Sequence, residues 1–321
     1  MVTGGAGFIG SHLVERLLQQ GASVVVVDDC STGRLCNLDG VANHPRLRII
    51  EGRLSEVIDL HRIIARCDAV FHLAAAVGVD LVVDNPLRLI ATNIGELDVV
   101  LGAAAASSVP VIFTSTSEVY GRRSCELFRE DDDLMVGRPH LSRWSYASSK
   151  LMGEFMAHAY AAERELPVVI ARLFNTVGPR QTGTYGMVLP RFINAALDGE
   201  PLRVFGDGTQ RRTFCAVDDT VEALIRLWHA PGTIGNVFNI GGPEDIAIVD
   251  LACLVIDTLN SRSTLEFVPY EQAYGSGFED LPHGRPALDR LCAATGFRPA
   301  TTLQTIIQRA AAAEVEARLL L

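Results

Sequence analysis

Thr3-Gly-Gly-Ala-Gly-Phe-Ile-Gly10 lies at the start of the chain and leads into a helix-like run over residues 11–20. Its glycines leave the backbone N–H groups at the start of that helix open to a bound phosphate. The apolar run Val24-Val-Val-Val27 then ends in Asp28, where a carboxylate binds ribose hydroxyls and repels a 2′-phosphate. The pattern therefore predicts a site for NAD rather than NADP.

The rest of the first half of the chain alternates between strand-like and helix-like segments. Short β-branched runs over 69–73, 111–113 and 168–171 predict strands buried on both faces, and the stretch 93–106 predicts a helix between two of them. This alternation indicates an α/β fold with a Rossmann-type, doubly wound parallel sheet. Because only Met1 and Val2 precede the glycines, the first strand is either very short or begins upstream.

Glycine and proline become frequent after about residue 175, and strand-like runs become sparser. We therefore expect an NAD-binding Rossmann domain over 1–174 and mainly a smaller, loop-rich substrate lobe over 175–321. The apolar run Val237-Phe-Asn-Ile240, near 236–240, predicts a strand that returns to the first domain.

The composition argues against several other classes of protein. The 321 residues are 48% hydrophobic, enough to bury a large core. A formal charge of −10 without a basic run argues against nucleic acid or an anionic membrane as a partner. Seven scattered cysteines without metal-ligand spacing predict reduced thiols and no metal site. With no signal segment and no apolar run of membrane-spanning length, we expect a cytoplasmic protein.

Tyr146-Ala-Ser-Ser-Lys150 forms a second pattern, because residues four apart share one face of a helix. A lysine ammonium there is expected to lower the tyrosine pKa, so that the phenolate removes a proton from a sugar hydroxyl while hydride leaves for NAD. Thr116 and Glu118 follow the apolar run 111–113, and ligands bind such sheets at the carboxyl ends of strands. Thr116 is expected to hydrogen-bond the reacting oxygen, and Glu118 to act at the neighbouring carbon.

Together these motifs resemble the extended short-chain dehydrogenase/reductases that act on nucleotide sugars as epimerases, dehydratases and decarboxylases. The resemblance covers nearly the whole chain. Its motifs are Thr3–Gly10, Asp28–Gly33, His72–Ala75, Thr114–Gly121, Tyr146 with Lys150, Arg172–Asn175, Gly178-Pro179, Gln210–Phe214 and Val217–Asp219.

The resemblance implies roles for particular residues. Thr116, Tyr146 and Lys150 would form a catalytic triad, joined by Glu118. The residues implied to bind NAD are Gly4, Gly7, Phe8, Ile9, Gly10, Asp28, Ser31, Thr32, Gly33, Leu73, Ala74, Ala75, Asn93 and Lys150. Those implied to bind a nucleotide-diphosphate sugar, usually UDP-linked, are Ser117, Asn175, Val188, Leu189, Arg191, Val204, Arg212 and Arg285. Relatives commonly form homodimers through helices that correspond to 93–106 and 146–163.

Two places depart from the family pattern. Family members usually carry an acid that contacts adenine where this chain has Gly52-Arg53. Many relatives also carry an arginine two residues before a proline near the C-terminus, whereas His283-Gly-Arg-Pro286 places Gly284 there. Arg285 is the available replacement for that second diphosphate contact.

The resemblance leaves the reaction open. Thr116-Ser-Glu118, Arg143-Trp-Ser-Tyr146 and Tyr274-Gly-Ser-Gly-Phe278 are similar to motifs of UDP-glucuronate decarboxylases. A UDP-hexose or UDP-hexuronate 4-epimerase is nearly equally favoured, since the decarboxylase's late arginine is absent at Gly284. A 4,6-dehydratase ranks third, because Ser117 stands where many dehydratases have aspartate. A non-catalytic NAD sensor of Rossmann fold is the alternative of another class, and it gives no reason for the intact triad.

Overall fold

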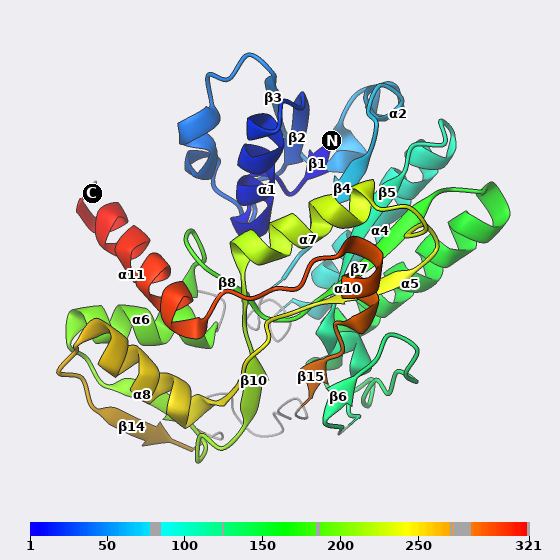
Figure 1. The fold of residues 1–321 in the computed structure, drawn as a ribbon. Coiled ribbons are helices and arrows are strands. Elements are labelled where there is room, and N and C mark those ends of the chain that lie inside the picture. The colour runs from blue at the N-terminus through cyan, green and yellow to red at the C-terminus, as the bar shows by residue number, and fades with distance from the viewer. Residues whose placement is uncertain (78–84, 124, 184–186, 270–271, 273–283, 320–321) are drawn as a thin grey trace.

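A seven-stranded, wholly parallel sheet forms the main layer of the fold (Figure 1). The computed structural model describes residues 1–77, 85–123, 125–183, 187–269, 272 and 284–319. The strand order is β12-β7-β5-β4-β1-β2-β3, which confirms the predicted Rossmann-type fold. The strands are β1 (Val2–Thr3), β2 (Val24–Asp28), β3 (Leu47–Glu51), β4 (Val70–His72), β5 (Val111–Thr116), β7 (Val168–Leu173) and β12 (Val237–Ile240).

The first strand is only two residues long, yet it lies in the interior of the sheet, between β4 and β2. Val2 pairs with Val26 of β2 on one side and with Phe71 of β4 on the other. The amino group of Met1 donates a hydrogen bond to the carbonyl oxygen of Ala69 at 2.7 Å. These pairings position the glycine turn directly after an interior strand of the sheet.

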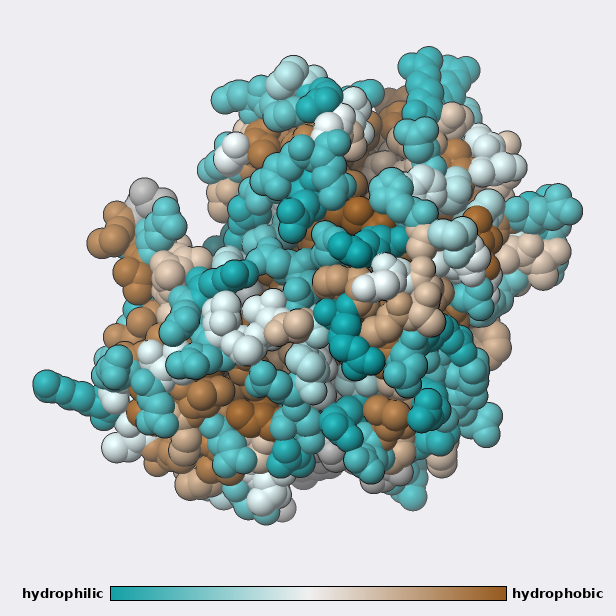
Figure 2. Space-filling view, in the orientation of Figure 1, coloured by the Kyte–Doolittle hydropathy of each residue, from teal (hydrophilic) through white to brown (hydrophobic). Residues whose placement is uncertain are grey.

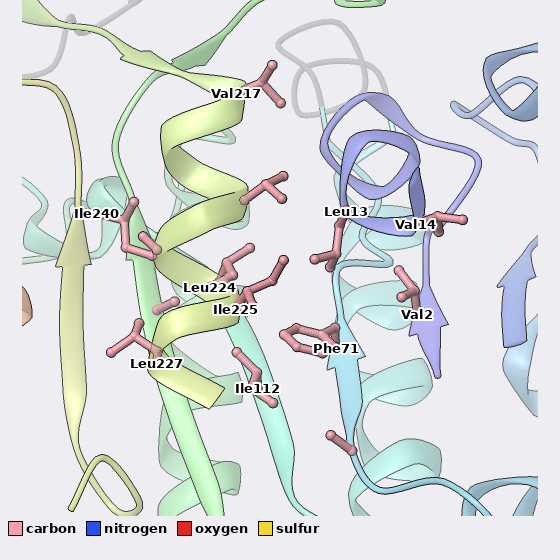
Figure 3. Packing of buried hydrophobic residues seen from close by; sticks show 14 of the residues in the cluster. Val2, Leu13, Val14, Phe71, Ile112, Val217, Leu224, Ile225, Leu227 and Ile240 are labelled. Carbon is pink, nitrogen blue, oxygen red and sulfur yellow. The ribbon is translucent and has the colours of Figure 1, made fainter. Parts of the chain in front are cut away.

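Helices cover both faces of the sheet because successive strand side chains point to opposite sides. One face packs against α1 (Phe8–Gln19) and α7 (Val217–His229); in Figure 3, Leu224 and Ile225 of α7 lie near Ile112 and Phe71. The other face packs against α2 (Leu60–Ile64), α4 (Pro86–Ala105) and α5 (Trp144–Arg164). The neighbours Ile112 and Phe113 therefore belong to different hydrophobic cores.

A smaller lobe with its own core lies beside the sheet, at the lower left of Figure 1. Its core is formed by α6 (Val188–Asp198), α8 (Ile248–Leu259), α11 (Leu303–Leu319) and the strand β9 (Leu202–Phe205), which pairs with β14 (Leu265–Val268). Two further pairs are β8 (Thr176–Val177) with β11 (Cys215–Ala216) and β10 (Arg211–Thr213) with β13 (Asp245–Ala247). The chain passes between sheet and lobe several times, since α7 and β12 pack with the sheet.

The remaining elements complete the edges. β6 (Leu127–Phe128) pairs with β15 (Arg285–Pro286), and α10 (Asp289–Thr295) contacts α7 and β12. Short 3-10 turns cover 35–41, 54–56 and 117–120. Figure 2 shows a mixed surface, largely hydrophilic with separate hydrophobic patches. Among the described residues, no helix combines the length and the apolar character needed to cross a membrane.

Candidate active site

A cleft of about 420 Å³ follows the carboxyl ends of the strands. The glycine turn, Asp28 and the segment after β4 line one half of it. Thr114–Glu118, Tyr146 and Lys150 line the middle, and residues from the start of α6 and from β10 line the far side. The two sequence patterns, over a hundred residues apart, therefore meet in one cavity.

The glycine turn is too tight for side chains at its ends. Gly4 has φ +69°, and a Cβ at position 10 would lie 2.0 Å from the carbonyl oxygen of Gly4. Gly7 caps α1 without a side-chain hydrogen bond, so the first N–H groups of the helix are directed at the cleft. With the helix dipole, they form a site that fits a pyrophosphate.

Asp28 is held rigidly at the end of β2. Its Oδ2 accepts a hydrogen bond from the N–H of Ala6 at 2.8 Å, and its Oδ1 accepts one from Cys30 at 2.9 Å. Burial raises the pKa of the carboxyl, and these two backbone hydrogen bonds oppose the rise. Ser31 and Thr32 line the cleft beside it, so this half fits the pyrophosphate and ribose of NAD.

Two residues implied to bind NAD support the cofactor half from behind. Asn93 is 7% exposed; its side chain hydrogen-bonds the N–H and the carbonyl of Ala76 and also Ser149. It thereby fixes the segment after β4, whose Leu73–Ala75 do line the cleft. Gly33 packs against the backbone of Ala6 and Gly7, with no room for a Cβ.

Lys150 is buried behind the chemical centre. Its Nζ donates a hydrogen bond to the carbonyl oxygen of Thr114 at 2.9 Å and lies 5.0 Å from the ring centroid of Phe113. Burial lowers the pKa of Lys150 to about 8, although the carboxylate of Glu154 acts in the opposite direction. Glu154 is itself held by a two-pronged ion pair with Arg172, which fixes α5 to β7.

Tyr146 lies beside Thr116 and Glu118. Burial raises its pKa, the charge of Glu118 raises it further, and a hydrogen bond with Thr116 lowers it. The expected lowering of the tyrosine pKa by Lys150 is therefore wrong for this structure, because desolvation dominates and the ammonium is directed at Thr114.

The partner of Glu118 was not predicted from the sequence. Arg143 Nη1 lies 3.6 Å from Glu118 Oε2, and the two side chains are 14% and 25% exposed. Arg143 directly precedes α5, three residues before Tyr146, so the start of one helix supplies both groups. Arg143 thus places a cation next to Glu118, which lines the middle of the cleft.

Five of the eight residues implied to bind the nucleotide sugar line the cleft: Ser117, Asn175, Val188, Leu189 and Arg212. The other three lie elsewhere. Val204 is fully buried in the core of the lobe, because its strand alternates inward and outward residues. Arg191 lies over the ring of Phe205 at 4.3 Å, and Arg285 Nη2 pairs with Glu126 at 2.8 Å.

Gly284 lines the cleft in place of the family arginine. A Cβ there would lie 2.1 Å from the ring of Phe128, which stacks on Tyr120 with ring centroids 4.6 Å apart. A side chain at position 284 therefore requires the aromatic stack to move. The motif Tyr274–Phe278 and His283 lie outside the described residues.

Comparison with protein families gives a match over residues 1–241 to the model described as the NAD dependent epimerase/dehydratase family. A UDP-N-acetyl-alpha-D-glucosaminuronate decarboxylase of Bacillus cytotoxicus is 39% identical over 300 residues, covering 93% of this chain and 92% of that protein. UDP-glucuronic acid decarboxylase 1 of Danio rerio is 34% identical, covering 95% of this chain and 69% of that protein.

A solved structure resembles the whole fold. The UDP-glucuronic acid 4-epimerase from Bacillus cereus, in complex with UDP-glucuronic acid and NAD, aligns with a TM-score of 0.88 at 28% identity and covers 98% of each chain. That protein thus holds a dinucleotide and a nucleotide sugar together.

Proposed function

This chain belongs to the NAD-dependent epimerase/dehydratase family, and we propose that it decarboxylates a UDP-hexuronate through transient oxidation at sugar C4. One observation carries the choice of reaction. Glu118 lines the middle of the cleft beside Tyr146, and Arg143 forms an ion pair with it. A simple 4-epimerase has no task for that carboxylate, whereas decarboxylation of a hexuronate needs a proton carrier at C5 and a cation that attracts the sugar carboxylate. The curated relatives named above support the same choice.

In this proposal Tyr146 takes the proton of the C4 hydroxyl, and Thr116 hydrogen-bonds the same oxygen. NAD, when bound, supplies the reversible hydride acceptor. The C5–C6 bond then breaks, carbon dioxide leaves, and the electron pair passes to the C4 ketone. C5 afterwards receives a proton that Glu118, the proposed carrier, takes up from solvent. The hydride then returns to C4, and Tyr146 returns its proton to the C4 oxygen. Arg143 attracts the sugar carboxylate and balances the charge of Glu118.

The same proposal gives the rest of the cleft its roles. Asn175 and Arg212 are proposed to bind the diphosphate, since forked guanidinium donors match its oxygens. Val188 and Leu189 at the start of α6 are proposed to enclose the base of the nucleotide.

Epimerisation at C4 is the second candidate, and Gly284 favours it. The close approach of Phe128 excludes an arginine there, so a cation that other decarboxylases use is missing. The similarity to the Bacillus cereus 4-epimerase supports this candidate as well.

The test is to incubate the purified protein and NAD with UDP-glucuronate, UDP-N-acetylglucosaminuronate and UDP-glucose, and to follow the sugars by NMR and mass spectrometry. Loss of carbon dioxide from either hexuronate supports decarboxylation. An unchanged mass with a galacto-configured product makes the protein an epimerase. Steady accumulation of NADH contradicts a cycle in which the hydride returns to the sugar. If none of the three UDP-sugars reacts, the result favours the non-catalytic NAD sensor instead.

We also propose a homodimer through α4 and α5. Three apolar side chains of these helices are exposed: Leu87 by 78%, Phe155 by 64% and Met152 by 48%. Such a patch stays covered when two copies pair helix to helix. Sedimentation at micromolar concentration is expected to give a dimer, and Phe155→Glu a monomer; a monomeric wild type contradicts the proposal.

A further inference from the structure

An ion pair lies at the far end of the cofactor half, and no step above uses it. Arg53 Nη2 lies 3.1 Å from Glu96 Oε1. Arg53 follows β3 and Glu96 belongs to α4, and both line the cleft together with Gly52 and Leu54. The Glu96 side chain is only 10% exposed, which is unusual for a carboxylate outside a specific site.

The order of the strands shows what reaches this pair. The start of α1 after β1 fits the pyrophosphate, and Asp28 at the end of β2 fits the adjoining ribose. The chemical centre lies on the opposite side, at the end of β5. The base on the Asp28 ribose therefore extends away from Tyr146, toward the end of β3 and α4. In NAD this base is adenine.

The pair offers an acceptor and donors side by side. Glu96 Oε1 is paired with Arg53 and accepts a hydrogen bond from Ser55 Oγ at 2.8 Å, whereas Oε2 accepts one from the N–H of Ser55 at 3.1 Å. Since a carboxylate oxygen accepts about two hydrogen bonds, Oε2 keeps one position beyond these described partners. Arg53 is 46% exposed and carries further N–H donors.

We propose that Glu96 and Arg53 select the base of the cofactor, with Glu96 accepting from the exocyclic amine of adenine and Arg53 donating to the adjacent ring nitrogen N1. Adenine presents a donor beside an acceptor on this edge. Hypoxanthine presents the reverse, so its oxygen meets the carboxylate and its N–H meets the guanidinium. In this proposal the carboxylate that contacts adenine is Glu96 of α4, and the N–H donor to N1 is Arg53.

The test measures binding in the absence of any sugar. The full chain, freed of bound nucleotide, is titrated by calorimetry with NAD and with nicotinamide hypoxanthine dinucleotide. The wild type is expected to bind NAD about tenfold more tightly or better, because a buried mismatch leaves polar groups unpaired. In Glu96→Gln the amide also donates, so the preference should fall to within about threefold.

Two further variants keep the test decisive. Glu56→Gln, an exposed neighbour outside the cleft lining, should leave both affinities unchanged. Arg53→Met leaves both Ser55 hydrogen bonds to Glu96 in place, so it provides a test even where Glu96→Gln fails to fold. It should reduce the preference for NAD over nicotinamide hypoxanthine dinucleotide. Equal affinities in the wild type, or an unchanged ratio in the folded variants, overturn the proposal. Since no sugar is present, neither outcome depends on which reaction the protein catalyses.

Discussion

The two halves of the cleft are built in different ways. The cofactor half is formed largely by the segments that follow the first three strands of the chain, including the glycine turn and Asp28. Backbone groups make up most of this half. The sugar half gathers Glu118, Arg143, Asn175, Arg212 and Gly284 from separate segments. A local motif is thus enough to form the first half, whereas the second depends on how distant segments pack. The identity of the substrate depends on the half that has no local motif.

The most damaging change to the sugar half should be Tyr146→Phe. Removing a positioned base costs about 10³-fold in turnover, within the range for such catalysis. NAD affinity should change little, because the glycine turn and Asp28 remain. Product formation followed by NMR and NAD titration by calorimetry would check both points. A turnover of Tyr146→Phe within tenfold of the wild type would contradict the assignment of catalysis to Tyr146 and of NAD binding to the other half of the cleft.

Glu118→Gln should separate decarboxylation from oxidation. We expect carbon dioxide release to fall about 100-fold, since a proton carrier is lost, while transient absorbance of reduced nicotinamide persists. Glu126→Gln changes an 82% exposed carboxylate paired with Arg285 and serves as the matched control. Equal loss of both signals would place Glu118 in the oxidation step instead.

In the cofactor half, Gly10→Ala and Gly95→Ala should have opposite effects on stability. A Cβ at position 10 meets the Gly4 carbonyl, so unfolding free energy should fall by about 1–3 kcal/mol. A Cβ at position 95, within α4, meets nothing within 4 Å, so the better helix former should add up to about 1 kcal/mol. Urea unfolding measures both values, and two changes of the same sign would contradict the tight-turn argument.

The smallest expected effect is a shift in pH dependence. The charge of Glu118 helps to raise the pKa of Tyr146, and the reactive form is the phenolate. Because burial also raises this pKa above its ordinary value, the rate of C4 oxidation should rise with pH over the whole range in which the protein stays folded. Glu118→Gln removes the charge and lowers the pKa, so the acid limb of the pH profile should move to lower pH. A limb that stays in place, as expected for Glu126→Gln, would mean that the two groups are not coupled.

Much of the sheet was predictable from sequence, because buried parallel strands are continuous apolar runs. The predicted segments 24–27, 111–113, 168–171 and 237–240 all lie in strands of the sheet. β3 was not predicted, since Leu47–Glu51 includes an arginine and a glutamate and its residues are only partly buried or exposed. Apolar runs thus predict the buried strands, including β12 at one edge of the sheet, but not the more exposed edge strand β3.

The site was predictable only where spacing along the chain sets the geometry. Tyr146 and Lys150 share a helix face, and Asp28 ends a strand next to the glycine turn, so both arrangements follow from periodicity. The Arg143 contact with Glu118 depends on the path of the intervening segment, which no local pattern reveals. Val204 looked like a substrate contact, but the alternation of β9 turns it into the core.

The place of β12 at the edge of the sheet has a consequence for how the chain folds during synthesis. The other six strands are complete by Leu173, and until Val237–Ile240 leaves the ribosome, β7 presents an unpaired edge. By then α6 and β9 of the lobe have already been made. The nascent protein therefore has an open sheet edge while residues 174–236 are made, which is the interval in which chaperones or a misplaced strand have access to it.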